Sequence, residues 1–156
     1  MTIYDKALNF FFTGKSEDGL KIHTSYGEME GMPLWYFFRS YEEMPVFERM
    51  ALNICEGRIL DVGAGTGCHA LILQQFENEV KAIDTSAEAV RIMKETGLKE
   101  AVQIDFFELQ DEKFNTIMCL MNGIGFIGKL ARLEAFLKKA EELLAPEGQL
   151  IFDSSD

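Results

Sequence analysis

The chain has 156 residues, 47% of them hydrophobic, and a formal net charge of −11, as expected for one acidic domain that buries about two-thirds of its unfolded surface. An acidic surface repels phosphate backbones, and no basic stripe occurs, so we expect no nucleic-acid partner. No apolar run approaches the ~20 residues of a membrane span, and no basic segment followed by an apolar one opens the chain, so we expect no membrane partner.

Residues 1–44 carry no motif but are rich in aromatic side chains. We predict a short helix over Tyr4 to Phe12, a polar loop over 14–19, and a cluster of five aromatic rings with Arg39 in segment 34–41. Large apolar groups need a surface to cover, so we predict that 1–44 form a mobile lid over a ligand site in the domain formed by 45–156. Core packing or a dimer surface is the alternative for the rings.

Within this lid, Arg39 is the candidate for direct ligand contact. A guanidinium can form a bidentate pair with a ligand carboxylate, and an aromatic face attracts a cation. The next element is a predicted helix that begins at Pro45 and stops before Gly57. Its apolar residues recur at helical spacing: Val46, Phe47, Met50, Ala51 and Ile54.

The strongest signal is a glycine loop at a strand-to-helix junction, with the sequence Asp-Val-Gly-Ala-Gly-Thr-Gly from Asp61 to Gly67. Such a loop lets a ligand approach main-chain atoms. Dinucleotide sites usually have the spacing G-x-G-x-x-G, but here Cys68 occupies the place of the third glycine. The carboxylate of Asp61 would repel a pyrophosphate and attract an ammonium or a sulfonium. S-adenosylmethionine carries both of these cations and no phosphate.

Two more strands are predicted to end in an acid. The first runs from Glu79 to Asp84, and Asp84 follows Gly65 by 19 residues, near the roughly 20 expected for an acid that binds ribose hydroxyls. The second runs from Ala101 to Asp105. Open α/β sheets bind ligands at the carboxyl ends of their strands, so we interpret these acids as ligand residues, with helix or turn capping as the alternative.

The remaining elements continue an alternating pattern. Residues 85–88 have the spacing of a capping box before a helix that Gly97 ends. A buried strand is predicted over 115–121, a stub of helix between 105 and 115, an amphipathic helix over 130–144 and a fifth strand over 149–153. The glycine-rich segment 121–128 follows the fourth strand, and Asn122 is its polar residue best placed to contact a ligand; a plain turn is the alternative.

The ordered series of the glycine motif, the segment Ala82-Ile-Asp-Thr-Ser86 and Asp105 resembles a class I S-adenosylmethionine-dependent methyltransferase from about Arg58 to Asp153. The resemblance implies an α/β, Rossmann-like three-layer sandwich with a mostly parallel sheet of about five strands. It also implies that Asp84 holds the ribose hydroxyls and Asp105 contacts the adenine amino group. The expected cofactor-binding residues are Asp61, Gly63, Ala64, Gly65, Gly67, Asp84, Thr85, Asp105, Phe106, Asn122 and Arg39.

The family usually has two further strands, whereas this sequence stops just past the fifth. We therefore expect either a fragment or a form that lacks the last two strands, with one sheet edge uncovered, an edge through which two copies can form a homodimer. The resemblance implies transfer of a methyl group to a small-molecule acceptor. An NAD(P)- or flavin-binding oxidoreductase domain and a non-catalytic S-adenosylmethionine-binding domain are the alternatives. No residue is identified as a catalytic base.

The chain has three cysteines and two histidines. The cysteines are far apart and odd in number, so we expect core thiols in a reducing, cytoplasmic compartment rather than a disulfide. Two histidines are too few for a metal site, and we expect none. His69 opens the helix after the glycine loop, where a packing role is the simpler expectation and a place near the ligand the alternative.

Overall fold

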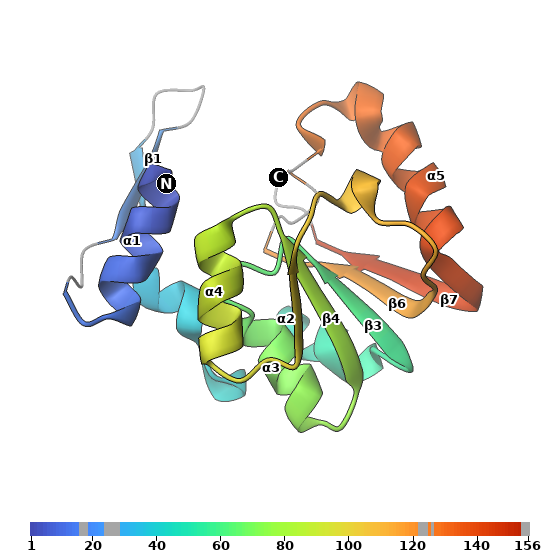
Figure 1. Ribbon diagram of the computed structural model, residues 1–156, viewed down its shortest axis with the longest axis horizontal. Helices are drawn as coiled ribbons and strands as arrows, with labels where there is room; N and C mark the ends of the chain where they lie inside the picture. Colours follow the sequence, from blue (N-terminus) through green and yellow to red (C-terminus); the bar gives the residue numbers. More distant parts are fainter. Residues whose placement is uncertain (16–18, 24–28, 122–124, 126, 154–156) are drawn as a thin grey trace.

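The structure, a computed structural model, describes residues 1–15, 19–23, 29–121, 125 and 127–153. Its centre is a sheet of strand order β5-β4-β3-β6-β7 in which all neighbouring strands are parallel (Figure 1). The predicted α/β fold with five parallel strands is confirmed. The strands are β3 (Arg58–Val62), β4 (Glu79–Asp84), β5 (Glu100–Gln103), β6 (Phe114–Cys119) and β7 (Leu144–Phe152).

Helices cover both faces of this sheet and complete a three-layer sandwich. One core cluster joins the strands to α2 (Val46–Ile54), α3 (Cys68–Gln75) and α4 (Ala87–Glu95). The second joins them to α5 (Leu133–Leu143) and the short helix η3 (Phe106–Glu108). Alternate residues of a strand point to opposite faces, so Ile59 packs in the first cluster and Leu60 in the second. Both are fully buried, as expected for a parallel strand.

The N-terminal segment adds a small third core beside the sandwich. Helix α1 (Ile3–Phe12) packs against α4, where Leu8 meets Ala89 and Ile92, which confirms the predicted first helix. Its first turn has a capping box formed by Thr2 and Asp5. The segment continues through an antiparallel pair, β1 (Leu20–His23) and β2 (Met29–Met32), which the sequence pattern does not predict, and the short helices η1 (Leu34–Phe38) and η2 (Tyr41–Glu43).

The apolar stripe of α2 faces outward, although such a stripe ordinarily faces the core. Val46, Phe47, Met50 and Ile54 are each 58–62% exposed, whereas the charged Glu48 is buried. Glu48 forms an ion pair beneath the helix, described below, on the side of α2 where Ala51 and Leu52 are also buried. A hydrophobic pattern finds the helix, but it does not determine the buried face when a charged residue has partners inside.

Several element boundaries also differ from the predictions. Ser86, and not Thr85, caps α4, because its hydroxyl accepts a hydrogen bond from the Ala89 amide at 3.0 Å. The predicted helix over 130–144 begins as a short helix η5 (Leu130–Arg132) and ends at Leu143, where the chain enters β7 directly. Among the described residues, no helix combines the length and the apolar character that crossing a bilayer requires.

Candidate functional site

The glycine loop lies between β3 and α3, and four of its amides have acceptors within the protein. Phosphate-binding loops present free amides to the ligand, but here the loop is closed on itself and on the end of β4. A pyrophosphate would therefore find few donors. The bonds run from Gly63 and Ala64 to the carbonyl of Ile83 (2.9 and 3.0 Å), from Gly65 to Asp84 Oδ2 (2.9 Å) and from Gly67 to the carbonyl of Ala64 (2.9 Å).

Two of the glycines are required by their surroundings. Gly67 has φ +80°, and a Cβ there would lie 2.7 Å from Met93 Cγ. Gly65 has φ +57°, and a Cβ there would lie 3.3 Å from the hydroxyl of Tyr4. Positive φ is costly for a residue with a side chain. The loop is thus shaped to pack closely on α4 at one glycine and to admit a side chain of α1 at another.

Asp61 is a buried carboxylate with an unused oxygen. It is 2% exposed, and its Oδ2 has no hydrogen-bond partner among the residues that the structure describes. Burial raises its pKa to about 6, with a further contribution from the charge of Asp84, while His69 and the Ala70 amide act in the opposite direction. An orphaned carboxylate oxygen is unfavourable in a folded protein. A bound cation would supply both the missing hydrogen-bond donor and the missing charge.

Asp84 ends β4 and is held by two backbone amides. Its Oδ2 accepts from Gly65 at 2.9 Å, and its Oδ1 accepts from Ser86 at 2.8 Å. Burial raises its pKa, although these amides favour the charged form. A carboxylate has about four acceptor positions, so each oxygen can still accept a hydrogen bond from a hydroxyl group. The carboxylate is fixed in place and able to bind two adjacent hydroxyls.

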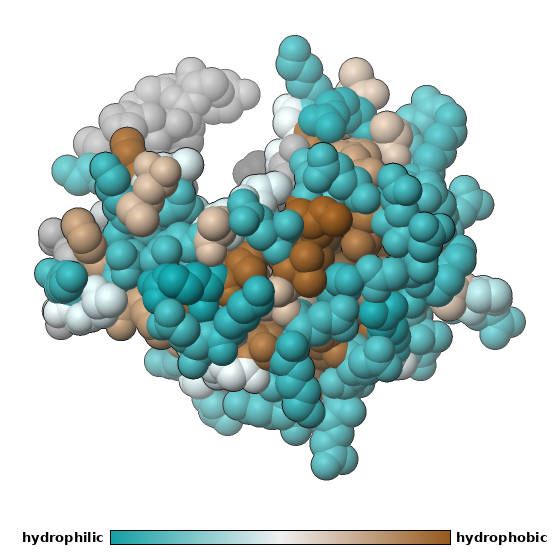
Figure 2. All heavy atoms as spheres, viewed as in Figure 1, coloured by the Kyte–Doolittle hydropathy of each residue, from teal (hydrophilic) through white to brown (hydrophobic). Residues whose placement is uncertain are grey.

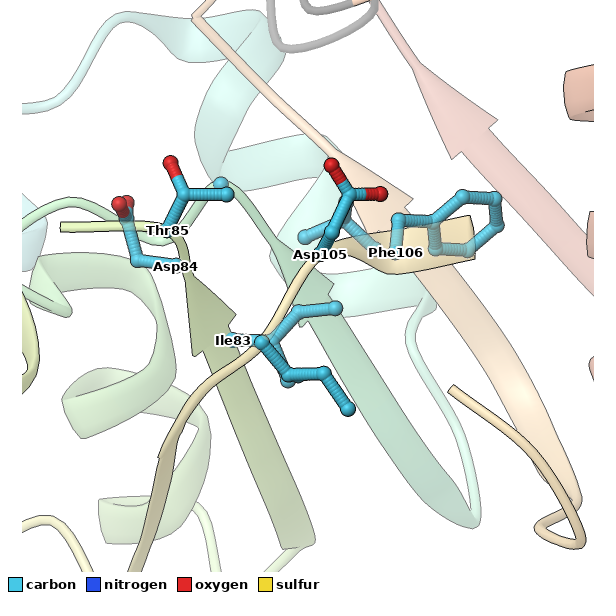
Figure 3. A pocket seen from close by; sticks show the side chains of 8 residues that line it. Ile83, Asp84, Thr85, Asp105 and Phe106 are labelled. Atoms are coloured by element: carbon cyan, nitrogen blue, oxygen red, sulfur yellow. The ribbon is translucent and has the colours of Figure 1, made fainter. Parts of the chain in front are cut away.

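A cavity of about 240 Å³ opens between Asp84 and Asp105. Figure 3 shows both carboxylates pointing to the same side, with Ile83 below them and Phe106 beyond Asp105. The wall is mainly apolar, with Ile104 as its other large side chain, and Figure 2 shows apolar side chains gathered in the middle of this face, between α4 and α5. The amide of Phe107 fixes Asp105 by donating to its Oδ1 at 2.8 Å. A flat ring with polar edge groups suits such a slot.

A second cavity, of about 310 Å³, adjoins the first at Gly63, which lines both. Asp61 and the glycine loop form one side of it. The N-terminal segment forms the opposite side, with a T-shaped pair between the rings of Tyr4 and Phe37 at 5.6 Å. Burial raises the pKa of the Tyr4 hydroxyl. The described residues that line it are Tyr4, Met32, Phe37, Asp61, Gly63, Ala64, Gly65, Thr66, Cys68, His69, Leu120 and Met121.

Arg39 does not take the position predicted for it. Its guanidinium is enclosed, with a bidentate pair to Glu48 at 2.9 and 3.3 Å and the ring of Tyr36 against it at 3.5 Å. It is absent from the lining of the cavity that holds Asp61. An arginine whose charge is already paired has little to gain from a second carboxylate. The structure therefore gives Arg39 an internal partner in place of the expected ligand carboxylate.

The other predicted site residues fall into three groups. Gly63, Ala64 and Gly65 line the cavities together with the three acids, and so do Thr85 and Phe106. Gly67 stands behind them as the N-cap of α3. Asn122 lies outside the described residues. Among the described residues, no group of three histidine, cysteine or acidic side chains is placed to hold a metal ion.

The sequence analysis missed most of the N-terminal wall. Tyr4, Met32 and Phe37 line the cavity, but they belong to no motif, and only the density of aromatic residues near position 37 gave a general signal. Glu48 was missed because it lies in an apolar helix. Met121 is expected only as the end of the strand over 115–121 and the start of the glycine-rich segment 121–128; its positive φ of 59° cannot be inferred from sequence. Its amide donates to Asp153 Oδ2 at 3.0 Å.

Comparison with known proteins gives a consistent set of matches. Residues 59–148, more than half of the chain, match the sequence pattern of a family described as a methyltransferase domain. An uncharacterized methyltransferase of Staphylococcus carnosus (strain TM300) is 37% identical over 82 residues, which cover 52% of this chain and 38% of that protein. A ubiquinone biosynthesis O-methyltransferase of Xanthomonas oryzae pv. oryzae is 25% identical over 111 residues, which cover 66% and 45%.

One solved structure resembles nearly the whole chain. It is a SAM-dependent methyltransferase from Bacteroides fragilis in complex with S-adenosyl-L-homocysteine, with 42% identity and a TM-score of 0.90 over 98% of this chain and 64% of that one. The likeness therefore includes the N-terminal segment as well as the sheet. The chain spans less than half the length of these two curated relatives and under two-thirds of that solved chain.

Proposed function

Because the chain belongs to the class I S-adenosylmethionine-dependent methyltransferase family, we propose that it binds S-adenosylmethionine and transfers the methyl group to a small-molecule acceptor. The bound donor supplies an activated methyl group on a sulfonium. What the chain must add is a site that holds the donor in one orientation and keeps water away from the reacting atoms.

The observation that carries this proposal is the oxygen of Asp61 that has no partner among the described residues, beside a glycine loop in which four amides are already paired. A dinucleotide needs the reverse: free amides and no buried carboxylate near its pyrophosphate. A ligand with an ammonium group satisfies Asp61 and needs no phosphate-binding amides. The same two features argue against an oxidoreductase that binds NAD(P) or a flavin.

The two adjoining cavities suit the two ends of such a donor. We assign Asp61 to the ammonium of the amino-acid end and Asp84 to the ribose hydroxyls. We assign Asp105 to the adenine amino group, with the apolar walls of the 240 Å³ cavity at Ile83 and Phe106 against the adenine faces. These assignments agree with the positions of the three acids along one edge of the sheet, where open α/β folds bind ligands.

Residues 1–44 are proposed to cover the amino-acid end of the donor. Tyr4 and Phe37 face the glycine loop across the 310 Å³ cavity, and the Thr66 hydroxyl donates to the carbonyl of Phe37, which ties this segment to the loop. An aromatic cover excludes water and presents ring faces to a cation. The methyl acceptor would then approach from the glycine-rich segment after β6.

We also propose a small acceptor, a reducing compartment and a homodimer. An acidic chain suits a small acceptor better than a nucleic acid. The cysteines are free thiols, and burial raises the pKa values of Cys55 and Cys68 to about 12, which fits a reducing, cytoplasmic compartment. The expected homodimer would use β7, an edge strand of the sheet. Its test is the molar mass measured by light scattering.

Thermal shift and calorimetry with S-adenosylhomocysteine and NAD test the proposed donor. We expect S-adenosylhomocysteine to raise the melting temperature and NAD to leave it unchanged, because a ligand stabilises the fold only to the extent that it binds the native state. Tighter binding of NAD would overturn the proposal. A radiolabelled methyl-transfer assay with candidate phenols, amines and carboxylic acids then tests the activity.

A further inference from the structure

Three buried side chains form a connected charged cluster between the N-terminal segment, α2 and α3. Glu48 Oε2 lies 2.9 Å from Arg39 Nη2 and 2.8 Å from His69 Nε2. Arg39, Glu48 and His69 are 3, 2 and 4% exposed. Burial alone would raise the pKa of Glu48, but the hydrogen bond and charge of His69, together with Arg39, hold it below its usual value. Glu48 is therefore an anion with two partners, and the cluster is built around it.

Only one member of this cluster reaches the cavity that we assign to the amino-acid end of the donor. His69 lines that cavity together with Asp61, whereas Arg39 and Glu48 do not. Among the described residues of the lining, His69 is the one side chain that can carry a positive charge, and Asp61 is the one carboxylate. The wall therefore offers one group for a cation, near the end of β3, and one for an anion, at the start of α3.

An α-amino acid is a zwitterion, with an ammonium and a carboxylate on the same carbon, and it needs a partner for each. We propose that His69 binds the carboxylate of the donor's amino-acid end while Asp61 binds its ammonium. This inference rests on the proposed function and names the recognition group that Arg39 was expected to provide. Arg39 instead acts indirectly, because it neutralises Glu48 and Glu48 orients the imidazole.

The hydrogen bonds determine which ring nitrogen is available. Glu48 is an acceptor, so the Nε2 of His69 carries a proton and donates to it. This leaves Nδ1 as the ring nitrogen for the ligand. Nδ1 can donate to a ligand carboxylate only when it also carries a proton, and Glu48 lies where it would pair with the resulting charge. Among the described residues, the other charged or ionisable groups around the ring are Arg39 across Glu48, Asp61 at the end of β3, the thiol of Cys68 in the same helix and the hydroxyl of Tyr4 in the same cavity lining.

The competing interpretation is that Glu48 and His69 only fasten α2 to α3. In that case the loss of His69 would lower stability and would weaken every ligand of the cavity to the same degree. The proposal instead predicts an effect that depends on one group of the ligand. The test therefore compares S-adenosylhomocysteine with its decarboxylated analogue, which keeps the amine and lacks the carboxylate.

Dissociation constants are measured by calorimetry for both ligands with the wild type, His69→Gln and, as a matched control at the adenine end, Asp105→Asn. Glutamine can still donate to Glu48 but cannot become a cation, and circular dichroism checks the fold. We expect the wild type to prefer S-adenosylhomocysteine by about tenfold or more, the size of a hydrogen bond to a charged group. His69→Gln should abolish this preference, whereas Asp105→Asn should weaken both ligands and keep it.

Two results would overturn the proposal. The first, seen with the wild type alone, is equal binding of both ligands, and the second is a His69→Gln variant that keeps the wild-type preference. His69→Asn provides a second variant, with the same expectation, should the glutamine variant fail to fold. If the wild type binds neither ligand, the donor itself is wrong, and the proposed function fails along with the inference. A wild-type preference that His69→Gln keeps leaves the function standing and removes only the role of His69.

Discussion

The two adjoining cavities that we assign to the donor are bounded by two walls, and these walls are built in different ways. The wall formed by the sheet edge consists of motif residues, with Asp61 and Asp84 fixed by backbone bonds or burial. The wall formed by the N-terminal segment is aromatic, with Tyr4 and Phe37 packed edge to face. The first wall carries charge and few large side chains, whereas the second carries large side chains and no charge.

This difference indicates a division of work. Charged groups at the sheet edge can recognise the ammonium and hydroxyl groups of a ligand, at the cost of burying carboxylates whose pKa values are raised. The aromatic wall has few polar groups with which to recognise a ligand, but it can exclude water. Substitutions in the first wall should therefore change which ligand binds, and substitutions in the second should change how well the site is closed.

The largest effect is expected for Asp84→Ala. The variant loses the acceptor for both ribose hydroxyls, worth about 1.5–3 kcal/mol for each bond to the charged group. It also leaves the Gly65 and Ser86 amides without their acceptor, so the melting temperature should fall as well. Calorimetry with S-adenosylhomocysteine measures the first effect. An unchanged dissociation constant would show that Asp84 only organises the loop.

Leu8→Ala should disrupt the packing of the N-terminal wall and leave the sheet folded. Leu8 is fully buried in the small core between α1 and α4, and such a truncation costs about 2–5 kcal/mol. We expect α1 to detach, trypsin to cleave faster after Lys15, and S-adenosylhomocysteine to protect this site in the wild type. Equal cleavage with and without ligand would contradict the lid assignment of residues 1–44.

Asp61→Asn should separate stability from binding. A carboxyl pKa raised from 3.8 to about 6 means that the native state holds the proton more tightly than the unfolded state, so stability is lost as the pH rises from about 4 to 6. This loss is roughly 3 kcal/mol above that range. The variant should melt higher than the wild type at pH 8 and show a smaller difference at pH 4, while binding the donor more weakly. A lower melting temperature at pH 8 would contradict the account.

Tyr4→Phe should have the smallest effect. The substitution removes one hydroxyl at the cavity and keeps the ring that closes it, so donor affinity should fall only by the net value of one hydrogen bond, about 0.5–1.5 kcal/mol. Phe37→Ala, which removes the ring opposite, is the matched comparison and should cost more. A larger loss for Tyr4→Phe would show that the aromatic wall also recognises polar groups.

The sheet and its acids were predictable because their signals are local. The glycine loop follows a strand, and Asp84 and Asp105 follow strands whose carboxyl ends must meet at one edge in a parallel sheet. The order of the elements and the ends of β4 were predicted correctly on this basis. Errors occurred where a boundary depended on one bond, as at Ser86, which caps α4 in place of Thr85.

The N-terminal wall was not predictable in detail because its contacts join residues that are distant in the sequence. Nothing near Tyr4 indicates that its hydroxyl reaches Gly65. Arg39 was noticed as a cation near aromatic rings, but its partner Glu48 was hidden on the inner side of a helix with an exposed apolar stripe. Tertiary packing determines which two charged side chains form a pair, whereas a sequence pattern shows only which residues are charged.

We assign the orphaned oxygen of Asp61 to the donor's ammonium group, and a crystal structure of this chain with S-adenosylhomocysteine tests this assignment. We expect the ammonium within hydrogen-bond distance of Asp61 Oδ2, the ribose hydroxyls on Asp84 and the adenine between Ile83 and Phe106. A ligand bound with Asp61 Oδ2 still unpartnered, or with its adenine end in the cavity beside Tyr4, would contradict it.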